Sequence, residues 1–176
     1  IQNSKIWKEN NQSYPAFNLY NYQTASIRSN QMNFLFIDDN TITDELKLIL
    51  KDDKTIVLIL TSSDKHSVML HRKFIIDMFD LGITAPVILK RSYNDISDLD
   101  FQIKSSIDIG SLYIDGLGDG VWVDFGSEYG IVNQTVFGIL QASRMRISKT
   151  EYISCPSCGR TPVSYTHLTL PTNSSV

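Results

Sequence analysis

Short apolar runs alternate along the chain with segments in which apolar residues recur every three or four positions. These runs lie at residues 33–37, 55–60 and 86–89, and the second is rich in β-branched side chains. Such runs predict strands of a parallel sheet that is covered on both faces. A shorter run at residues 112–114 predicts a fourth strand, and residues 151–154 predict a last one.

Helices are predicted between these runs. Thr43 is placed to cap a helix that continues to Lys51, and Gly82 stands where a longer helix from about residue 64 to 81 would end. Residues 96–106 predict a helix or an irregular crossover, and residues 131–145 a further helix. The side chains expected to face inward are Val68, Ile75, Met78 and Phe79 in the long helix, and Val132, Val136, Ile139 and Leu140 in the last one.

This alternation predicts the α/β class, with right-handed βαβ units around a parallel sheet. A (β/α) barrel and an open doubly wound sheet both fit the spacing. Residues 32–145 form the predicted βα domain, and residues 146–161 a linker and the start of another domain. Residues 1–31 are polar without a clear apolar period, so an irregular or broken start is expected. Residues 162–176 resemble a translated sequencing adapter and are expected to be foreign, which would leave the chain incomplete.

Composition narrows the functional classes. An apolar content of 42% and a charged content of 20% are typical of a soluble globular protein. No apolar run is long enough to span a membrane, so no membrane association is expected. A net charge of −3 argues against a general nucleic-acid-binding protein.

The only two cysteines, Cys155 and Cys158, stand in the order Cys-Pro-Ser-Cys-Gly. This spacing lets two thiolates face one metal centre, but it fills only half of a tetrahedral site. Three chemistries remain open from the local residues: a zinc knuckle, an iron–sulfur cluster and a metal-free dithiol. Local sequence favours zinc over the cluster.

Three other features are candidates for chemistry. Arg144, Arg146, Ser148 and Lys149 gather cations and hydroxyls that could bind phosphate, or could simply form a solvated helix end. The glycine-rich stretch 115–120, which follows the predicted fourth strand, is either a site loop or a sharp turn. His66 and His71 are interpreted as surface or packing histidines rather than metal ligands.

Three blocks of sequence together resemble 4-hydroxy-3-methylbut-2-enyl diphosphate synthase in its large, three-domain form. They are Asp-Gly-Leu-Gly-Asp-Gly-Val at 115–121, Phe-Gly-Ile-Leu-Gln-Ala-Ser-Arg-Met-Arg at 137–146, and Thr-Glu-Tyr-Ile-Ser-Cys-Pro-Ser-Cys-Gly-Arg-Thr at 150–161. The strong match covers residues 111–161. Residues 32–110 match only in βα character.

The resemblance implies a barrel-like inserted domain followed by the truncated start of an α+β iron–sulfur domain. It also implies an oxidoreductase of the methylerythritol phosphate route to isoprenoids, which converts 2-C-methyl-D-erythritol 2,4-cyclodiphosphate to 4-hydroxy-3-methylbut-2-enyl diphosphate. Cys155 and Cys158 match two of the three cysteines that, with a glutamate, hold a [4Fe-4S] cluster. This reverses the ranking of zinc and cluster, because deoxygenation needs low-potential electrons that zinc does not provide.

The resemblance further implies ferredoxin or flavodoxin as the electron donor. It implies a cytoplasmic enzyme in a bacterium or a plastid enzyme in a plant, and it is compatible with a homodimer. Arg144, Arg146, Ser148 and Lys149 become candidates for binding the diphosphate, with Arg146 and Ser148 preferred. They could instead brace the linker between the barrel and the cluster domain. The third cysteine and the glutamate are absent, so the chain alone is expected to be inactive and to hold no stable cluster. The rival interpretation is a zinc-knuckle adaptor or binding module.

Overall fold

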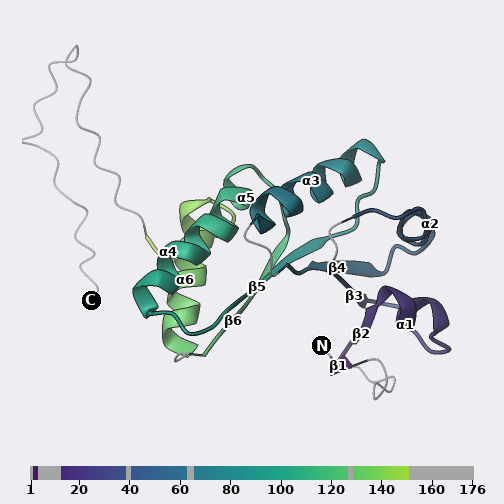
Figure 1. The fold of residues 1–176 in the computed structure, drawn as a ribbon, viewed down its shortest axis with the longest axis horizontal. Coiled ribbons are helices and arrows are strands. Elements are labelled where there is room, and N and C mark those ends of the chain that lie inside the picture. Colours follow the sequence, from purple (N-terminus) through teal and green to yellow (C-terminus); the bar gives the residue numbers. More distant parts are fainter. Residues whose placement is uncertain (1, 4–12, 39–40, 63–65, 127–128, 151–176) are drawn as a thin grey trace, which may run out of the picture.

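The structure, a computed structural model, describes residues 2–3, 13–38, 41–62, 66–126 and 129–150. Its framework is a six-stranded sheet in which all paired strands are parallel and neighbours in space are also neighbours in sequence (Figure 1). The strands are β1 (Gln2–Asn3), β2 (Pro15–Asn18), β3 (Asn33–Ile37), β4 (Ile56–Leu60), β5 (Val87–Tyr93) and β6 (Gly120–Phe125).

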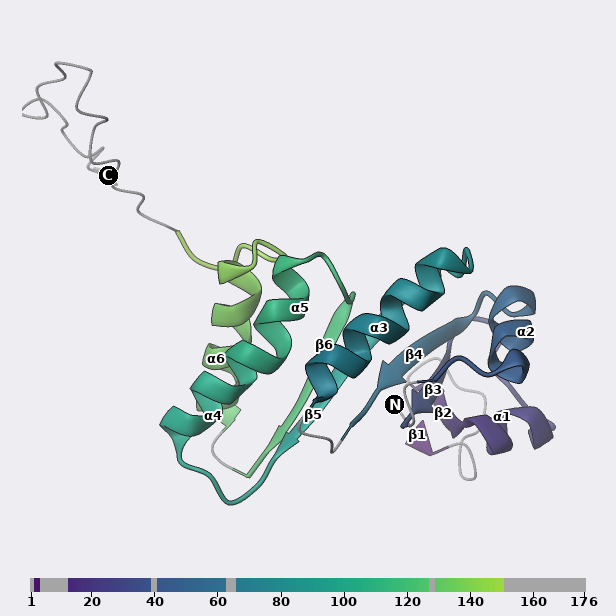
Figure 2. The ribbon, with the colours of Figure 1, turned by 45° about the horizontal axis from the view of Figure 1, so that its top comes forward.

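From β2 onwards, helices connect successive strands, and the chain advances from one end of the sheet to the other (Figure 2). A single continuous helical stretch between β5 and β6 contains α4, η1 and α5, of which η1 is one turn of π-helix. The helices are α1 (Leu19–Thr24), α2 (Asp44–Asp52), α3 (Ser67–Asp80), α4 (Asp98–Ser105), η1 (Ser106–Gly110), α5 (Ser111–Ile114) and α6 (Tyr129–Ala142).

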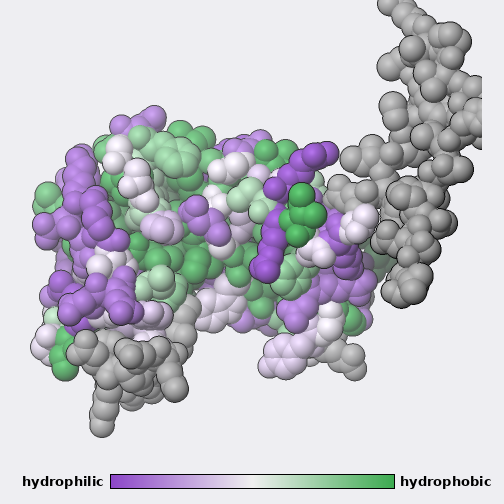
Figure 3. All heavy atoms as spheres, turned by 180° about the vertical axis from the view of Figure 1, so that it is seen from behind, coloured by the Kyte–Doolittle hydropathy of each residue, from purple (hydrophilic) through white to green (hydrophobic). Residues whose placement is uncertain are grey.

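One core lies between the helices and one face of the sheet. Alternate strand residues such as Leu35, Leu58 and Leu89 are buried there against helical side chains such as Phe74 and Tyr113. Strand side chains of the opposite phase, such as Ile59, do not belong to this core although Ile59 is also buried. The helices therefore pack against one face of the sheet. From behind, hydrophobic residues form green areas of the surface between hydrophilic ones (Figure 3).

Two predicted helix boundaries are confirmed by their hydrogen bonds. The Thr43 hydroxyl accepts a bond of 3.2 Å from the Leu46 amide and caps α2. Gly82 ends α3 with a positive φ of 67°, and the Ile83 amide donates to the Met78 carbonyl across it. This is a Schellman cap, which favours glycine because a side chain there would strain the backbone.

The predicted fourth strand is wrong. Residues 112–114 belong to α5, and the sixth strand of the sheet begins only at Gly120. A short apolar run does not distinguish a strand from the buried turn of a helix, and here Leu112 and Tyr113 face the core from a helix. Residues 1–31, expected to be irregular, contain β2 and α1, whose Phe17 and Tyr22 pack edge to face.

Some predicted inward residues also differ. Ile75 and Met78 are buried, whereas Phe79 is 59% exposed. In α6 Ile139 is buried and Leu140 packs against the core, but Val132 and Val136 are only half-buried. β6, which α6 contacts, is the last strand in the order of the described sheet. Among the described helices, none has the length and apolar character of a membrane span.

Candidate functional site

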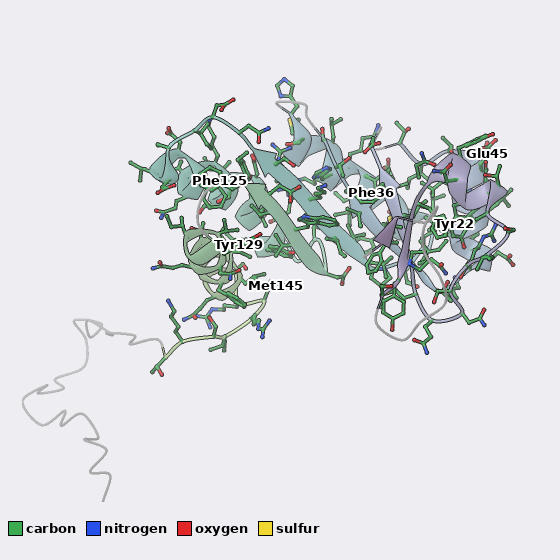
Figure 4. The ribbon with its side chains drawn as sticks, turned by 90° about the horizontal axis from the view of Figure 1, so that it is seen from below. Tyr22, Phe36, Glu45, Phe125, Tyr129 and Met145 are labelled. Atoms are coloured by element: carbon green, nitrogen blue, oxygen red, sulfur yellow. The ribbon has the colours of Figure 1, made fainter. Side chains whose placement is uncertain are left out.

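The sequence-based candidates near the C-terminal end of α6 are partly described. Cys155 and Cys158 lie outside the described residues, so their role as metal ligands stays a prediction. Arg144, Ser148 and Lys149 are described and exposed. The chain leaves α6 at this end, beside Met145 (Figure 4).

Arg144 ends α6 in the left-handed backbone region, with a φ of 60°. Its amide donates to the Gln141 carbonyl at 3.0 Å, and the Met145 amide donates to the Leu140 carbonyl at 2.9 Å. These two bonds make a Schellman cap in which an arginine occupies the position usually taken by glycine. The cap turns the chain back along the helix.

The side chain of Gln141 holds the returning segment. Its Oε1 accepts hydrogen bonds from the Lys149 amide at 2.9 Å, from the Ser148 hydroxyl at 3.1 Å and from the Ser148 amide at 3.3 Å. Its Nε2 donates to the Lys149 carbonyl at 3.0 Å. The amide group thus pairs with the backbone of Lys149 as a neighbouring strand would. We call this set of four bonds the Gln141 clamp.

The four predicted phosphate-binding residues do not form one site in this arrangement. Ser148 and Lys149 line a cavity of about 260 Å³ together with Phe137, Gly138, Gln141 and Ala142. The Arg146 guanidinium lies 5.1 Å from the centre of the Phe137 ring, and neither it nor Arg144 lines the cavity. The Ser148 hydroxyl is engaged by Gln141. Phosphate binding by these four residues stays a prediction.

The glycine-rich stretch 115–120 is a turn between a helix and a strand. It follows α5 and precedes β6, so it lies at the amino end of its strand rather than at the carboxyl end, where α/β sites are usually built. Gly116 has a φ of 73° within another Schellman cap, because the Leu117 amide donates to the Leu112 carbonyl. Asp119 accepts from the Val87 amide at 2.8 Å and so ties the turn to β5. The prediction of a strand before this stretch was wrong, and the stretch has the geometry of a sharp turn.

Sequence reasoning missed a polar cluster at the carboxyl end of β5. The Arg91 guanidinium donates to the Asp108 carboxylate at 2.9 Å and 3.2 Å, and to the Ser62 carbonyl at 2.7 Å. The Tyr93 hydroxyl donates to the same carboxylate oxygen at 3.0 Å. Asp108 lies on the π-helical turn η1. This cluster therefore joins β5, the residues after β4 and the continuous helical stretch of α4, η1 and α5.

His71 lies beside this polar cluster and is 1% exposed. Burial, reinforced by the nearby positive charge of Arg91, lowers the pKa of His71 to about 4. Burial and the negative charge of Asp108 raise the pKa of Tyr93. Both side chains are therefore neutral at pH 7. His71 is a packing histidine, as predicted, while His66 is exposed.

The opposite face of the sheet carries a smaller cluster around Lys90. Its ammonium lies 4.4 Å from the centre of the Trp122 ring and 3.3 Å from the Asp124 carboxylate. Phe36, labelled in Figure 4, lies on the same face of the sheet, with its ring centre 6.1 Å from that of Trp122. Asp124 neutralises the Lys90 ammonium on this face, and the Ser92 hydroxyl donates to the same carboxylate at 3.4 Å. Within the described ranges, no group of three or more histidine, cysteine or acidic side chains could hold a metal ion.

Comparison with known proteins gives a clear family. No protein-family model matches the chain, and no solved structure matches it significantly. The chain is similar to 4-hydroxy-3-methylbut-2-en-1-yl diphosphate synthase (flavodoxin) from Parabacteroides distasonis, with 37% identity over 162 residues, which is 92% of this chain and 26% of that protein. The synthase of the same name from Bacteroides thetaiotaomicron is 38% identical over 163 residues, or 92% of this chain and 27% of that protein.

A plant relative matches over a shorter stretch. The chloroplastic 4-hydroxy-3-methylbut-2-en-1-yl diphosphate synthase (ferredoxin) of rice is 43% identical over 82 residues, or 46% of this chain and 11% of that protein. The bacterial matches are longer than the segment 111–161 that carries the motif resemblance, so the similarity extends into the βα part. The chain spans about a quarter of the length of these bacterial relatives. It belongs to the 4-hydroxy-3-methylbut-2-en-1-yl diphosphate synthase family, as a partial segment of the longer members.

Proposed function

We propose that the chain is part of a reductive synthase of isoprenoid biosynthesis. The reaction converts 2-C-methyl-D-erythritol 2,4-cyclodiphosphate to 4-hydroxy-3-methylbut-2-enyl diphosphate, with uptake of two electrons and two protons and release of one water. The observation that carries the proposal is the similarity over 92% of the chain to bacterial proteins named for this synthesis. None of the curated relatives compared above is named as a zinc-binding adaptor.

Cys155 and Cys158 are proposed to hold two corners of a [4Fe-4S] cluster. Their donor chemistry fits, because iron–sulfur clusters are bound by soft thiolates and a Cys-x-x-Cys turn presents two of them to one centre. The remaining ligands would come from other parts of the synthase. When bound, such a cluster supplies low-potential electrons for the removal of oxygen from the substrate.

The sheet is proposed to be part of a (β/α) barrel. Strands that are parallel, follow chain order and carry their helices on one face are the arrangement of such barrels. An open doubly wound sheet instead carries helices on both faces and contains a point where the strand order reverses. In a closed barrel the face that holds Lys90 and Trp122 would point inward.

The segment after α6 is proposed to bind the diphosphate through Arg144, Arg146, Ser148 and Lys149, with Arg146 and Lys149 as its charged contacts. Both are exposed, and neither belongs to an ion pair that the structure describes. Charge-assisted bonds to phosphate oxygens are strong and tolerate a flexible cationic side chain. The Arg144 backbone forms the helix cap while its side chain is exposed. A secondary contribution to the positive charge that attracts the diphosphate is proposed for it.

The electron donor is proposed to be a flavodoxin or a ferredoxin. The bacterial relatives that cover 92% of this chain carry flavodoxin in their names, and the rice relative carries ferredoxin and is chloroplastic. A bacterial synthase of this kind would work in the cytoplasm, and a plant one in the plastid.

The test is the metal content of the full-length synthase that contains this segment. We expect Cys155→Ser to remove most of the bound iron and acid-labile sulfide after anaerobic reconstitution, because it removes one thiolate ligand. Ser157→Ala, between the two cysteines, is the matched control and should keep the wild-type iron content. Zinc in place of iron, or full iron and sulfide in Cys155→Ser, would refute the assignment.

A further inference from the structure

The Gln141 clamp fixes the path of the chain on its way to the cysteine pair. Gln141 and Phe137 lie four residues apart and therefore on the same face of α6. The Arg146 guanidinium packs over the Phe137 ring. One helical turn after Phe137, the side-chain amide of Gln141 pairs with the backbone of Ser148 and Lys149. The segment 145–149 is therefore anchored at two points along the last turns of the helix.

The small residues of this face leave room beneath the anchored segment. Gly138 and Ala142 line the cavity of about 260 Å³ together with Ser148 and Lys149. The segment thus contacts the helix mainly through its polar anchors rather than through a packed apolar seam. Its position consequently depends on the Gln141 side chain, which makes four of its hydrogen bonds.

We propose that Gln141 is a positioning residue that orients the cluster-binding segment relative to the βα domain. The proposal rests on the proposed function, in which Cys155 is a cluster ligand. Lys149 and Cys155 are six residues apart, so even an extended chain spans at most about 21 Å between them. A clamp on Lys149 therefore limits where Cys155 can lie, and small displacements of a reacting centre lower the rate strongly.

The experiment compares three variants of the full-length synthase, reconstituted anaerobically. Gln141→Ala removes all four bonds, and Gln141→Glu keeps an acceptor for Ser148 and Lys149 but loses the donor to the Lys149 carbonyl. Gln134→Ala, on the same helix but outside the clamp, is the matched control. Hydrogen exchange of the Ser148 and Lys149 amides reports the clamp directly, while iron content, kcat and KM report its consequence.

We expect exchange at these two amides to rise about tenfold in Gln141→Ala, since the bonds that protect them are lost. In the same variant kcat should fall about tenfold while iron content stays near the wild-type value. KM should rise as well, because the released Lys149 is a proposed contact of the diphosphate. Gln141→Glu should lie between Gln141→Ala and the wild type, and Gln134→Ala should match the wild type in every measurement.

Each other outcome overturns the proposal. Unchanged amide exchange in Gln141→Ala would mean that the clamp does not form, and faster exchange with wild-type kcat would mean that it does not position the segment. Loss of iron in Gln141→Ala alone would assign Gln141 to cluster assembly instead. Full iron in Cys155→Ser would refute the proposed function, while the amide exchange would still decide whether the clamp exists.

Discussion

At the residue scale, the structure separates two histidines that look alike in sequence. His66 is exposed before α3, whereas His71 is buried one turn later against Arg91 and Asp108. The His71 side chain hydrogen-bonds to the backbone of Thr61, and its Nε2 has no partner among the described residues. A buried imidazole beside a guanidinium resists protonation, because a second positive charge would be neither solvated nor balanced.

Because of this environment, the free energy of unfolding decreases as the pH is lowered through a defined range. The pKa of His71 is lowered from 6.5 to about 4 by folding, so above pH 6.5 the ring is neutral in both states and its full contribution is present. As pH falls from 6.5 towards 4, only the unfolded chain takes up the proton. We expect protonation of His71 in the unfolded chain to lower the unfolding free energy of the wild type by about 2 kcal/mol when the pH is lowered from 7 to 5.

The measurement is urea unfolding of the chain at pH 7 and pH 5. The unfolding free energy of His71→Gln should lack this component and should depend less on pH than that of the wild type. Equal pH dependence of His71→Gln and the wild type would show that the ring is accessible to protons in the folded state.

At the element scale, the π-helical turn η1 brings Asp108 to the sheet. The turn lies in the middle of the long helix between β5 and β6 and places Asp108 within reach of both Arg91 and Tyr93. Such turns insert one residue into a helix and so change which side chains face a neighbour. The ion pair is largely buried, with side-chain exposures of 14% for Arg91 and 19% for Asp108.

Breaking this pair should cost more than breaking an exposed one. We expect Asp108→Asn to lower the unfolding free energy by about 2 kcal/mol, because Arg91 is left buried without a counter-charge. Asp124→Asn breaks the pair with Lys90, in which Asp124 is 50% exposed, and should cost less than about 1 kcal/mol. Denaturant titration of both variants makes the comparison, and equal losses would contradict the structural role of Asp108.

At the scale of the whole molecule, three parts follow one another along the chain. The sheet with its helices on one face comes first, then the cationic segment after α6, and then the cysteine pair. The parallel strands in chain order place β6 and α6 at one end of the sheet (Figures 1 and 2). The exposed cations Arg146 and Lys149 follow directly. This order puts positive charge between the βα part and the proposed cluster ligands.

If these cations bind the diphosphate, their loss should weaken substrate binding in the full-length synthase. We expect Arg146→Gln and Lys149→Gln each to raise KM for the cyclic diphosphate about tenfold, the effect of losing one charge-assisted hydrogen bond. Iron content should not change. Lys104→Gln, in the last turn of α4, is the control and should leave KM unaltered. A KM that is unchanged in both variants would restrict these residues to bracing the linker.

Sequence pattern alone determined the βα alternation, the strands β3, β4 and β5, the capped start of α2 and the family motifs, because these depend on local periodicity and on residue types at fixed spacing. Tertiary structure decided the rest. Residues 112–114 are apolar in either a strand or a buried helical turn, and only packing against the core selects the helix. The pairings of Arg91 with Asp108 and of Gln141 with Lys149 join residues 17 and 8 positions apart through a folded chain, so no local pattern encodes them.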